Sequence, residues 1–197
     1  MYDDAVRDHP ELKYGFAGLH ALHRDLKFDV LFTYNVNYDP PEKSARRLVD
    51  RKGKGFDVQW IELGNEPFWK TQRSEAIKTQ KDYLAVSKAH AAALRAVDPK
   101  IKISVPVHWR QAVSNPWNQP LMSETYFDAI TVHKHLEGKN TPEGLQRTLF
   151  TGQVLSEMAD TFLEIFPNHP IWLTEWSTGH GEHAISVLGM VDGFLTL

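Results

Sequence analysis

Two glutamates stand where the chain leaves predicted β-strands. Glu66 follows the strand predicted over residues 58–63, and Glu175 ends the strand predicted over residues 171–174. Barrel enzymes build their sites at this carboxyl end of parallel strands. A pair of carboxyl groups can cleave a glycosidic bond, because one protonates the leaving oxygen while the other attacks the anomeric carbon or activates water. Two simpler interpretations remain, with Glu66 an acid at a helix start beside Pro67 and Glu175 a solvated loop acid.

The strand period of two decides which neighbours share a face with each acid. It places Glu66 with Glu62, and Glu175 with Leu173 and Ile171, on faces that we expect to point into one site. Glu62 lies deeper than Glu66, so it would be a buried acid that needs a partner. This position favours a structural role for Glu62 over a catalytic one.

Two histidines extend the candidate site. His133 and His135 share a face at the end of the strand predicted over residues 127–133, where they could contact a substrate. A rival interpretation groups them with His108 as ligands of a zinc-like metal, since neutral imidazoles suit zinc. The His-x-His spacing is common by chance, so we expect no metal and no cofactor.

Aromatic and polar loop residues complete the candidates. Trp109, Trp117 and Trp176 lie in or near loops after strands, where an indole ring could stack on a sugar. Packing within the loops is an equal alternative for each. His180 and His183 follow Glu175 in a predicted polar loop that could border a substrate cleft.

Strand and helix patterns alternate along the chain to position these residues. The alternation indicates a parallel sheet with right-handed crossovers. Neither GxGxxG nor GxxxxGK[ST] occurs, so a closed barrel is favoured over an open nucleotide-binding sheet. Strands are predicted at residues 28–37, 58–63, 101–107, 127–133 and 171–174, and helices at 12–26, 41–52, 81–97 and 141–166.

Two strings of residues resemble signatures of clan A glycoside hydrolases, which are retaining TIM-barrel enzymes. The first is Trp60-Ile61-Glu62-Leu63-Gly64-Asn65-Glu66-Pro67, similar to the Asn-Glu-Pro motif of strand four. The second is Trp172-Leu173-Thr174-Glu175-Trp176, similar to the nucleophile motif of strand seven. The resemblance implies that Glu66 is the general acid/base, that Asn65 binds the sugar 2-hydroxyl and that Glu175 is the nucleophile. The clan includes xylosidases, arabinofuranosidases and glucuronidases.

The chain departs from that pattern in two respects. The clan often has His-x-Tyr on strand six, and here His135 stands in place of the tyrosine. The predicted strands match numbers three to seven, so strands one, two and eight and the usual strand-two arginine have no counterpart. The resemblance therefore implies an α/β fold that is an incomplete (β/α)8 TIM barrel, with residues 1–197 forming a single partial catalytic domain of a larger enzyme. An inactive carbohydrate-binding or structural remnant of the fold is the alternative, and a metal-dependent hydrolase is a third.

Composition limits the partners. The chain has 197 residues, fewer than the roughly 250 of a typical complete barrel. A net charge of -3 gives no basic footprint, so a carbohydrate is expected as partner and nucleic acid is not. No apolar run approaches the ~18 residues of a membrane span, so no membrane partner is expected. Cysteine is absent, and the acidic start from Met1 to Asp4 predicts no secretory signal.

Overall fold

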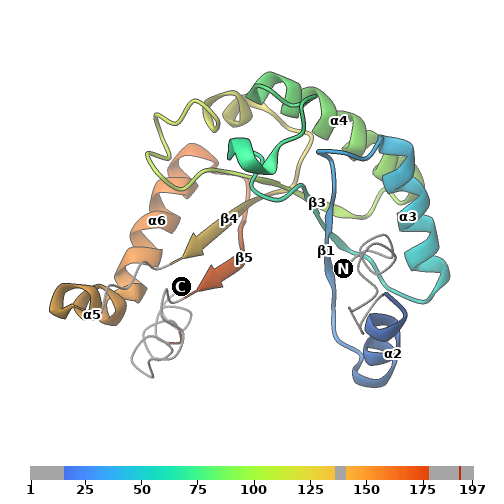
Figure 1. Cartoon of the computed structure of the whole chain (residues 1–197), viewed down its shortest axis with the longest axis horizontal. Coiled ribbons are helices and arrows are strands. Elements are labelled where there is room, and N and C mark those ends of the chain that lie inside the picture. The colour runs from blue at the N-terminus through green and yellow to red at the C-terminus, as the bar shows by residue number, and fades with distance from the viewer. Residues whose placement is uncertain (1–15, 136–140, 178–190, 192–197) are drawn as a thin grey trace.

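The computed structural model describes residues 16–135, 141–177 and 191 (Figure 1). Its sheet contains five parallel strands in the order of the sequence, β1-β2-β3-β4-β5. The strands are β1 (Leu31–Tyr34), β2 (Trp60–Leu63), β3 (Lys102–Pro106), β4 (Ala129–His135) and β5 (Ile171–Ser177). The predicted α/β architecture and the incomplete barrel are confirmed, because the sheet curls without closing.

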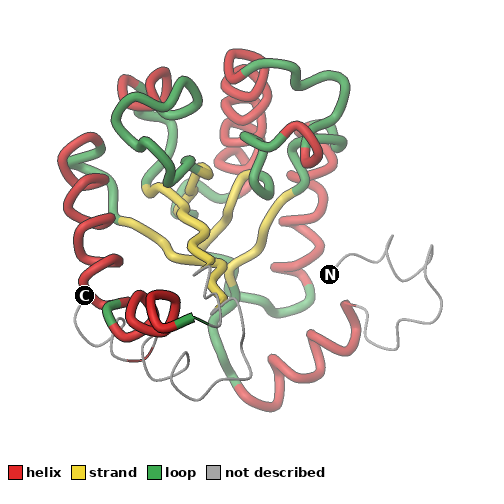
Figure 2. Tube along the Cα trace, turned by 60° about the vertical axis from the view of Figure 1, so that its left-hand side comes forward, coloured by secondary structure: helices red, strands yellow, loops and turns green. Residues whose placement is uncertain are grey.

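Helices cover the outer side of this curled sheet. In Figure 1 they form an arc around the strands, and Figure 2 shows the strands gathered inside that arc. Helices α3 and α4 pack against each other over the first half of the sheet, and α6 contacts β5. The described helices are α2 (Phe16–Leu26), α3 (Pro41–Gly53), α4 (Gln80–Val97), α5 (Pro142–Leu149) and α6 (Thr151–Ile165), with 3-10 turns η1 (Lys70–Gln72) and η2 (Gln119–Ser123).

Local sequence fixes the ends of helix α4. Thr79 and Asp82 form a capping box, in which the Thr79 side chain accepts from the Asp82 backbone N–H and the Asp82 carboxylate accepts from the Thr79 N–H. These two bonds satisfy amide groups that the first helical turn leaves without partners. The helix ends at Val97, immediately before Asp98 and Pro99, as predicted.

The two faces of the sheet differ in chemistry. Residues on the outer face, such as Ile103 and Val132, are fully buried against the helices. The inner face carries buried polar groups instead, and the Thr131 hydroxyl donates to Ser104 at 2.6 Å. Apolar burial on the outer face stabilises the sheet at about 25 cal/mol per Å². The inner face therefore holds the functional groups while the outer face holds the fold together.

The structure differs from the predicted elements in strand bounds, in one helix break and in the packing of α2. Strand β1 is shorter than the predicted 28–37, and β4 and β5 extend beyond their predicted ends. The helix predicted over residues 141–166 is two helices, because Phe150 leaves the helical region of backbone angles at ψ 24°. In α2, the helical spacing of Leu22 and Leu26 with Phe16 and Leu19 predicted one packed face, yet Leu22 and Leu26 are exposed. Residues 12–15 of that predicted helix lie outside the described residues.

Strands β1 and β5 form the two edges of the described sheet. None of the helices in the described part of the chain has the length and apolar character that a membrane crossing requires.

Candidate active site

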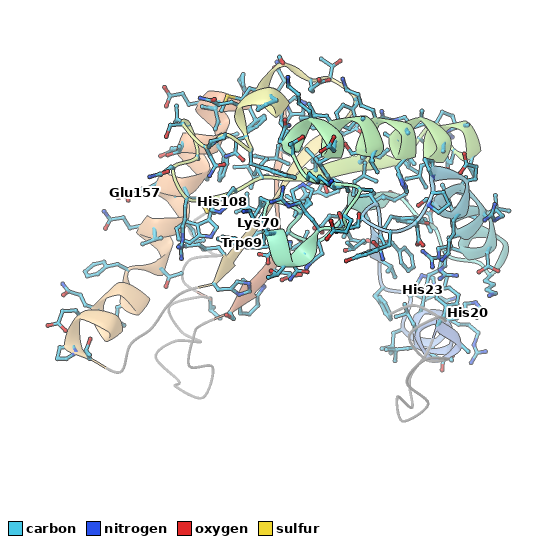
Figure 3. All side chains as sticks on the ribbon, turned by 45° about the horizontal axis from the view of Figure 1, so that its top comes forward. His20, His23, Trp69, Lys70, His108 and Glu157 are labelled. Carbon is cyan, nitrogen blue, oxygen red and sulfur yellow. The ribbon has the colours of Figure 1, made fainter. Side chains whose placement is uncertain are left out.

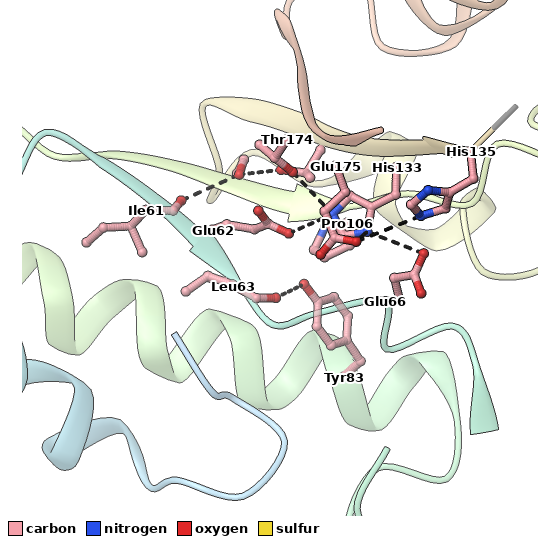
Figure 4. A network of polar contacts seen from close by, with 12 residues as sticks. Ile61, Glu62, Leu63, Glu66, Tyr83, Pro106, His133, His135, Thr174 and Glu175 are labelled. Carbon is pink, nitrogen blue, oxygen red and sulfur yellow. Dashed lines mark hydrogen bonds and ion pairs between the residues drawn. The ribbon is translucent and has the colours of Figure 1, made fainter. Parts of the chain in front are cut away.

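Acidic and histidine side chains meet at the carboxyl end of the sheet (Figure 4). The group consists of Glu62 of β2, Glu66 in the following loop, His133 of β4, and Thr174 and Glu175 of β5. Strands distant in sequence thus bring both predicted catalytic glutamates to one histidine ring. The structure places them as predicted, and their catalytic roles stay a prediction.

Glu66 reaches the site through a strained turn, not through the strand pleat. Strand β2 ends at Leu63, Gly64 has φ +91°, and Glu66 has φ +40°, a left-handed conformation that is uncommon outside glycine. A Cβ at Gly64 would lie 3.0 Å from Cγ2 of Val36. Glu66 therefore lies beyond the end of strand β2, and this turn gives it the side that it was expected to share with Glu62. The turn still directs both carboxylates to the same ring.

Glu175 reaches the inner face because strand β5 has a register irregularity. Val132 pairs with Leu173, but the next residue, His133, pairs with Glu175, so Thr174 is the extra residue of a bulge. A one-residue slip moves every later side chain to the opposite face of a strand. Leu173 packs with the outer core while Glu175 lies beside His133. The predicted shared face of Glu175 with Leu173 and Ile171 is therefore corrected by the bulge.

The His133 ring is the centre of the group. Its Nε2 lies 3.3 Å from Oε1 of Glu62 and 3.1 Å from Oγ1 of Thr174. Its Nδ1 lies 3.3 Å from Oε1 of Glu66 and 3.6 Å from Oε2 of Glu175. The side chains of His133 and Glu62 are each only 2% exposed, whereas Glu66 is 18% and Glu175 46% exposed. The buried pair thus supports two more accessible carboxylates.

The surrounding acids determine the charge of His133. Burial alone lowers the pKa of an imidazole, and it is the largest single influence here. The hydrogen bond and charge of Glu62, together with the charges of Glu175 and Glu66, outweigh it and raise the pKa of His133 above its ordinary value. The imidazolium therefore persists to higher pH than in a free histidine.

The shared histidine also limits the distance between the two candidate catalytic carboxylates. Oε1 of Glu66 and Oε2 of Glu175 can be no farther apart than the sum of their 3.3 and 3.6 Å distances to Nδ1 of His133. Retaining glycosidases hold their carboxyl groups about 5 to 5.5 Å apart, and inverting enzymes roughly 6.5 to 9.5 Å. This limit on the distance between the two carboxylate oxygens allows the retaining separation and excludes most of the inverting range.

His135 and Asn65 border the group without joining its centre. Nδ1 of His135 lies 2.9 Å from Oγ of Ser177, and its Nε2 is 3.9 Å from Oε2 of Glu175, beyond hydrogen-bond distance. Asn65 lines a cavity of about 360 Å³ beside β1, together with Thr33 and Tyr34. The predicted substrate contacts of both residues stay predictions.

The predicted tryptophan platforms are placed less favourably than expected. Lys134 stands over the Trp109 ring at 3.5 Å, and Trp109 packs against the outer core. Trp117 is 6% exposed and donates from Nε1 to the Pro106 carbonyl at 3.2 Å, which is the packing alternative. Trp176 is exposed, but it pairs in register with Lys134 and so shares the face opposite to His133.

Trp69 is an exposed ring that the sequence interpretation missed. Its backbone N–H donates to the Glu66 carbonyl at 2.9 Å, and its side chain is 39% exposed. Figure 3 shows it beside His108, with ring centroids 4.9 Å apart. Its position could have identified it from the sequence, because Trp69 lies three residues after Glu66 in the loop that follows β2.

His108 takes part in this aromatic group. The Arg110 N–H donates to Nδ1 of His108, so the ring proton is on Nε2. Burial and the Arg110 charge lower the pKa of His108, which keeps the ring neutral. Across residues 16–135, 141–177 and 191, no cluster of three or more His, Asp or Glu side chains is arranged to hold a metal ion. His180 and His183 lie outside the described residues.

A curled parallel sheet with paired glutamates at its carboxyl end is the architecture of barrel glycoside hydrolases. The chain belongs to the glycosyl hydrolases of family 39, whose model matches residues 40–185. The resemblance to clan A glycoside hydrolases is confirmed by this family and by the structural neighbours.

Solved structures share the fold at low sequence identity. An α-L-arabinofuranosidase from Thermotoga maritima matches with TM-score 0.68 and 18% identity over 83% of this chain. A family 44 endoglucanase from Clostridium thermocellum and a family 44 xyloglucanase from Paenibacillus polymyxa each match with TM-score 0.64 and 13% identity over 90% of it. The chain spans 37% of the arabinofuranosidase, 57% of the endoglucanase and 56% of the xyloglucanase. A comparison with curated protein sequences gives no match.

Proposed function

We propose that this chain carries both catalytic carboxylates of a retaining glycoside hydrolase that cleaves O-glycosidic bonds in an oligo- or polysaccharide. The observation that carries the proposal is the convergence of Glu66 and Glu175, from separate strands, on Nδ1 of one buried histidine. Membership of family 39 and the neighbouring glycosidase structures support it.

The proposed reaction is a double displacement. Glu175 attacks the anomeric carbon while Glu66 gives its proton to the leaving oxygen, so the glycosidic C–O bond breaks and a glycosyl ester forms on Glu175. Water then attacks the anomeric carbon, Glu66 accepts its proton, and the ester bond breaks to regenerate the Glu175 carboxylate. Asn65 is proposed to contact the sugar 2-hydroxyl.

The leaving-group side of the substrate is proposed to lie against the loop after Glu66. Trp69 presents an exposed indole there, and its ring packs against the buried His108. An indole face suits an uncharged sugar ring better than an anionic one. His133 and His135, from the neighbouring strand, are proposed to bound the sugar site itself.

Residues 1–197 are proposed to form one part of a single catalytic barrel. The remaining strands of that barrel are proposed to come from segments beyond this chain. The short span relative to the neighbouring enzymes and the edge position of β1 support this. The same two observations favour the second candidate function, an inactive carbohydrate-binding or structural remnant of the fold.

The test uses the full-length protein that contains this chain and 2,4-dinitrophenyl and 4-nitrophenyl glycosides of xylose, arabinofuranose and glucuronic acid. Glu175→Gln is expected to abolish turnover and the covalent glycosyl-enzyme seen by mass spectrometry. Glu66→Gln should spare the first step with dinitrophenyl leaving groups and slow it with poorer ones. Glu157→Gln makes the same chemical change on α6 and serves as control (Figure 3). Saccharide binding without turnover of any glycoside would favour the inactive remnant.

A further inference from the structure

The buried pair of Glu62 and His133 has no task in the double displacement described above. A carboxylate that is 2% exposed needs a partner to offset its lost hydration, and His133 at 3.3 Å is that partner. A simple structural pair could have been apolar, because buried ion pairs add little stability over well-packed apolar residues. The placement of this pair directly behind the two candidate catalytic acids therefore suggests a role in the reaction.

The acceptors around the His133 ring favour a proton on both of its nitrogens. Nε2 faces the Glu62 carboxylate and the Thr174 hydroxyl, and Nδ1 faces Glu66 and Glu175. An ionised carboxylate can only accept, so a nitrogen that faces one must donate. Only the imidazolium form donates from both nitrogens.

Nδ1 of His133 lies between two acceptors and is bonded to neither. The atom is buried and makes no hydrogen bond of acceptable angle, although oxygens of Glu66 and Glu175 lie 3.3 and 3.6 Å away. One N–H group therefore stands at similar distances from the two carboxylates that exchange roles in a double displacement. A small shift of either side chain would complete a bond with one or the other.

We propose that Glu62 is a positioning residue that holds His133 as an imidazolium whose Nδ1–H follows the negative charge from Glu175 to Glu66 and back. This inference rests on the proposed function. In the free enzyme the charge is on Glu175, which the N–H stabilises. Once the glycosyl ester has formed, Glu175 is neutral and Glu66 has lost its proton, so the same N–H stabilises Glu66. The histidine proton never leaves the ring, and the chemical balance of the reaction is unchanged.

Other ionisable groups around the pair are few in the described chain. Glu66 and Glu175 face Nδ1, His135 follows on β4 near Glu175, and β3 presents the neutral Ser104. Farther out, the charge of Glu62 helps to raise the pKa of Tyr83, and the charge of Glu66 acts to raise the pKa of His108 against its burial. Glu62 is the most buried acid among those that contact His133, so its removal should have the largest effect on the ring.

The first experiment measures the charge of His133 directly in the full-length protein. Ring 15N shifts are followed against pH by NMR, with His133 assigned by loss of its signals in His133→Asn. The wild-type titration midpoint is expected above the ordinary value of about 6.5. It should fall by about one pH unit or more in Glu62→Gln and stay within 0.2 or so in Glu157→Gln. A wild-type midpoint at or below the ordinary value overturns the proposal, whatever Glu62→Gln does.

The second experiment uses the full-length protein and tests the positioning role. Glu62→Gln is expected to lower kcat about tenfold or more and to move the alkaline limb of its pH profile downward, with Glu62→Asp restoring part of both. A crystal structure of the enzyme trapped with a 2-deoxy-2-fluoro glycoside should show Nδ1 closer to Glu66 than to Glu175. Unchanged kcat and pH profile in Glu62→Gln, or an Nδ1 still directed at the esterified Glu175, overturns the role. Absence of wild-type turnover is a failure of the proposed function instead, and the titration identifies it as such.

Discussion

The two faces of the same strands follow different rules. On the outer face, residues such as Ile61 and Ile103 alternate regularly and are fully buried against helices. On the inner face, Glu66 leaves the strand through a left-handed turn and Glu175 arrives through a bulge. The outer face tolerates no irregularity because packing requires a continuous apolar surface, whereas the inner face uses irregularities to direct side chains. The fold can therefore be perturbed through one face and the chemistry through the other.

Shifting Glu175 by one position along β5 should have the largest effect on activity. An alanine inserted between Thr174 and Glu175 takes the place opposite His133 and moves Glu175 opposite Lys134 on the outer face, where the core would exclude its charge. We expect glycosidase turnover to fall to the level of Glu175→Gln, with a loss of thermal stability as well. Aryl-glycoside kinetics and a melting curve measure the two effects. Thr174→Val keeps the residue count and should retain far more activity; equal loss in both variants would contradict the register explanation.

Truncating an outer-face residue should lower stability and leave the inner-face site unchanged. Ile103 is fully buried, so Ile103→Ala should destabilise the protein by about 2–5 kcal/mol through lost burial and a residual cavity. The titration midpoint of His133 should not move, because the inner face keeps its contacts. Urea denaturation gives the free energy of unfolding, and Val113→Ala at an exposed position should cost less than about 0.5 kcal/mol. A shifted His133 midpoint in Ile103→Ala would show that the two faces are coupled.

The turn at Gly64 packs against Val36 of the core and also positions Glu66. A change there should therefore affect both stability and turnover, to an intermediate degree. Gly64→Ala places a Cβ at φ +91° and 3.0 Å from Val36, so we expect a loss of about 1–3 kcal/mol of stability. Turnover should fall more than the stability loss explains, because Glu66 is displaced. Gly53→Ala, where a Cβ meets no atom within 4 Å, is the matched control. Full activity in folded Gly64→Ala would mean that the turn does not position Glu66.

The pH dependence of stability offers a finer comparison. The folded-state pKa of His133 is raised, so its stabilising contribution is complete below the unfolded value of about 6.5 and is lost as pH rises through the folded value. His90, His108 and His169 have lowered pKa values, so their effects fall at lower pH. Urea denaturation above the ordinary histidine pKa should therefore show stability declining in the wild type and less so in Glu62→Gln. An equal decline of stability in both proteins would show that Glu62 does not cause the pH dependence.

The smallest expected effect concerns substrate contact alone. Trp69→Ala removes an exposed ring beside Glu66, so KM for an oligosaccharide should rise a few-fold, equivalent to about 0.5–1 kcal/mol of lost binding. Melting temperature and kcat for a small aryl glycoside should stay close to wild type. Trp176→Ala removes another exposed ring, on the sheet face opposite to His133. A larger KM change for Trp176→Ala than for Trp69→Ala would reverse the assignment.

Most of the architecture could be predicted because it depends on patterns that are local in sequence. Alternating apolar residues in β3, and the Asp98-Pro99 pair that ends α4, indicated those elements close to their observed bounds. The five strands and their parallel order followed from the alternation of strand and helix. The break at Phe150 was missed because the apolar periodicity continues through it, and only the backbone angles reveal the change of helix.

The site was predictable in its members but not in its geometry. Glu66 and Glu175 were identified from their positions after strands and from the resemblance, and the structure brings both to His133. The period of two failed for Glu175, since an extra strand residue depends on tertiary packing that leaves no periodic trace. The positive φ of Glu66 left no trace in the pattern either. The partner of Glu62 is 71 positions away in the sequence, so its identity required the fold.

The bulge at Thr174 also has a consequence for comparing relatives. Residues before it on β5 and residues after it follow opposite parity, so an alignment that runs through this point without a gap would match inward positions with outward ones. A relative with a regular strand seven should lack one residue here while conserving the apolar pattern upstream. Ancestral or consensus reconstructions of this strand should therefore treat the segments on either side of Thr174 as separate alignment blocks.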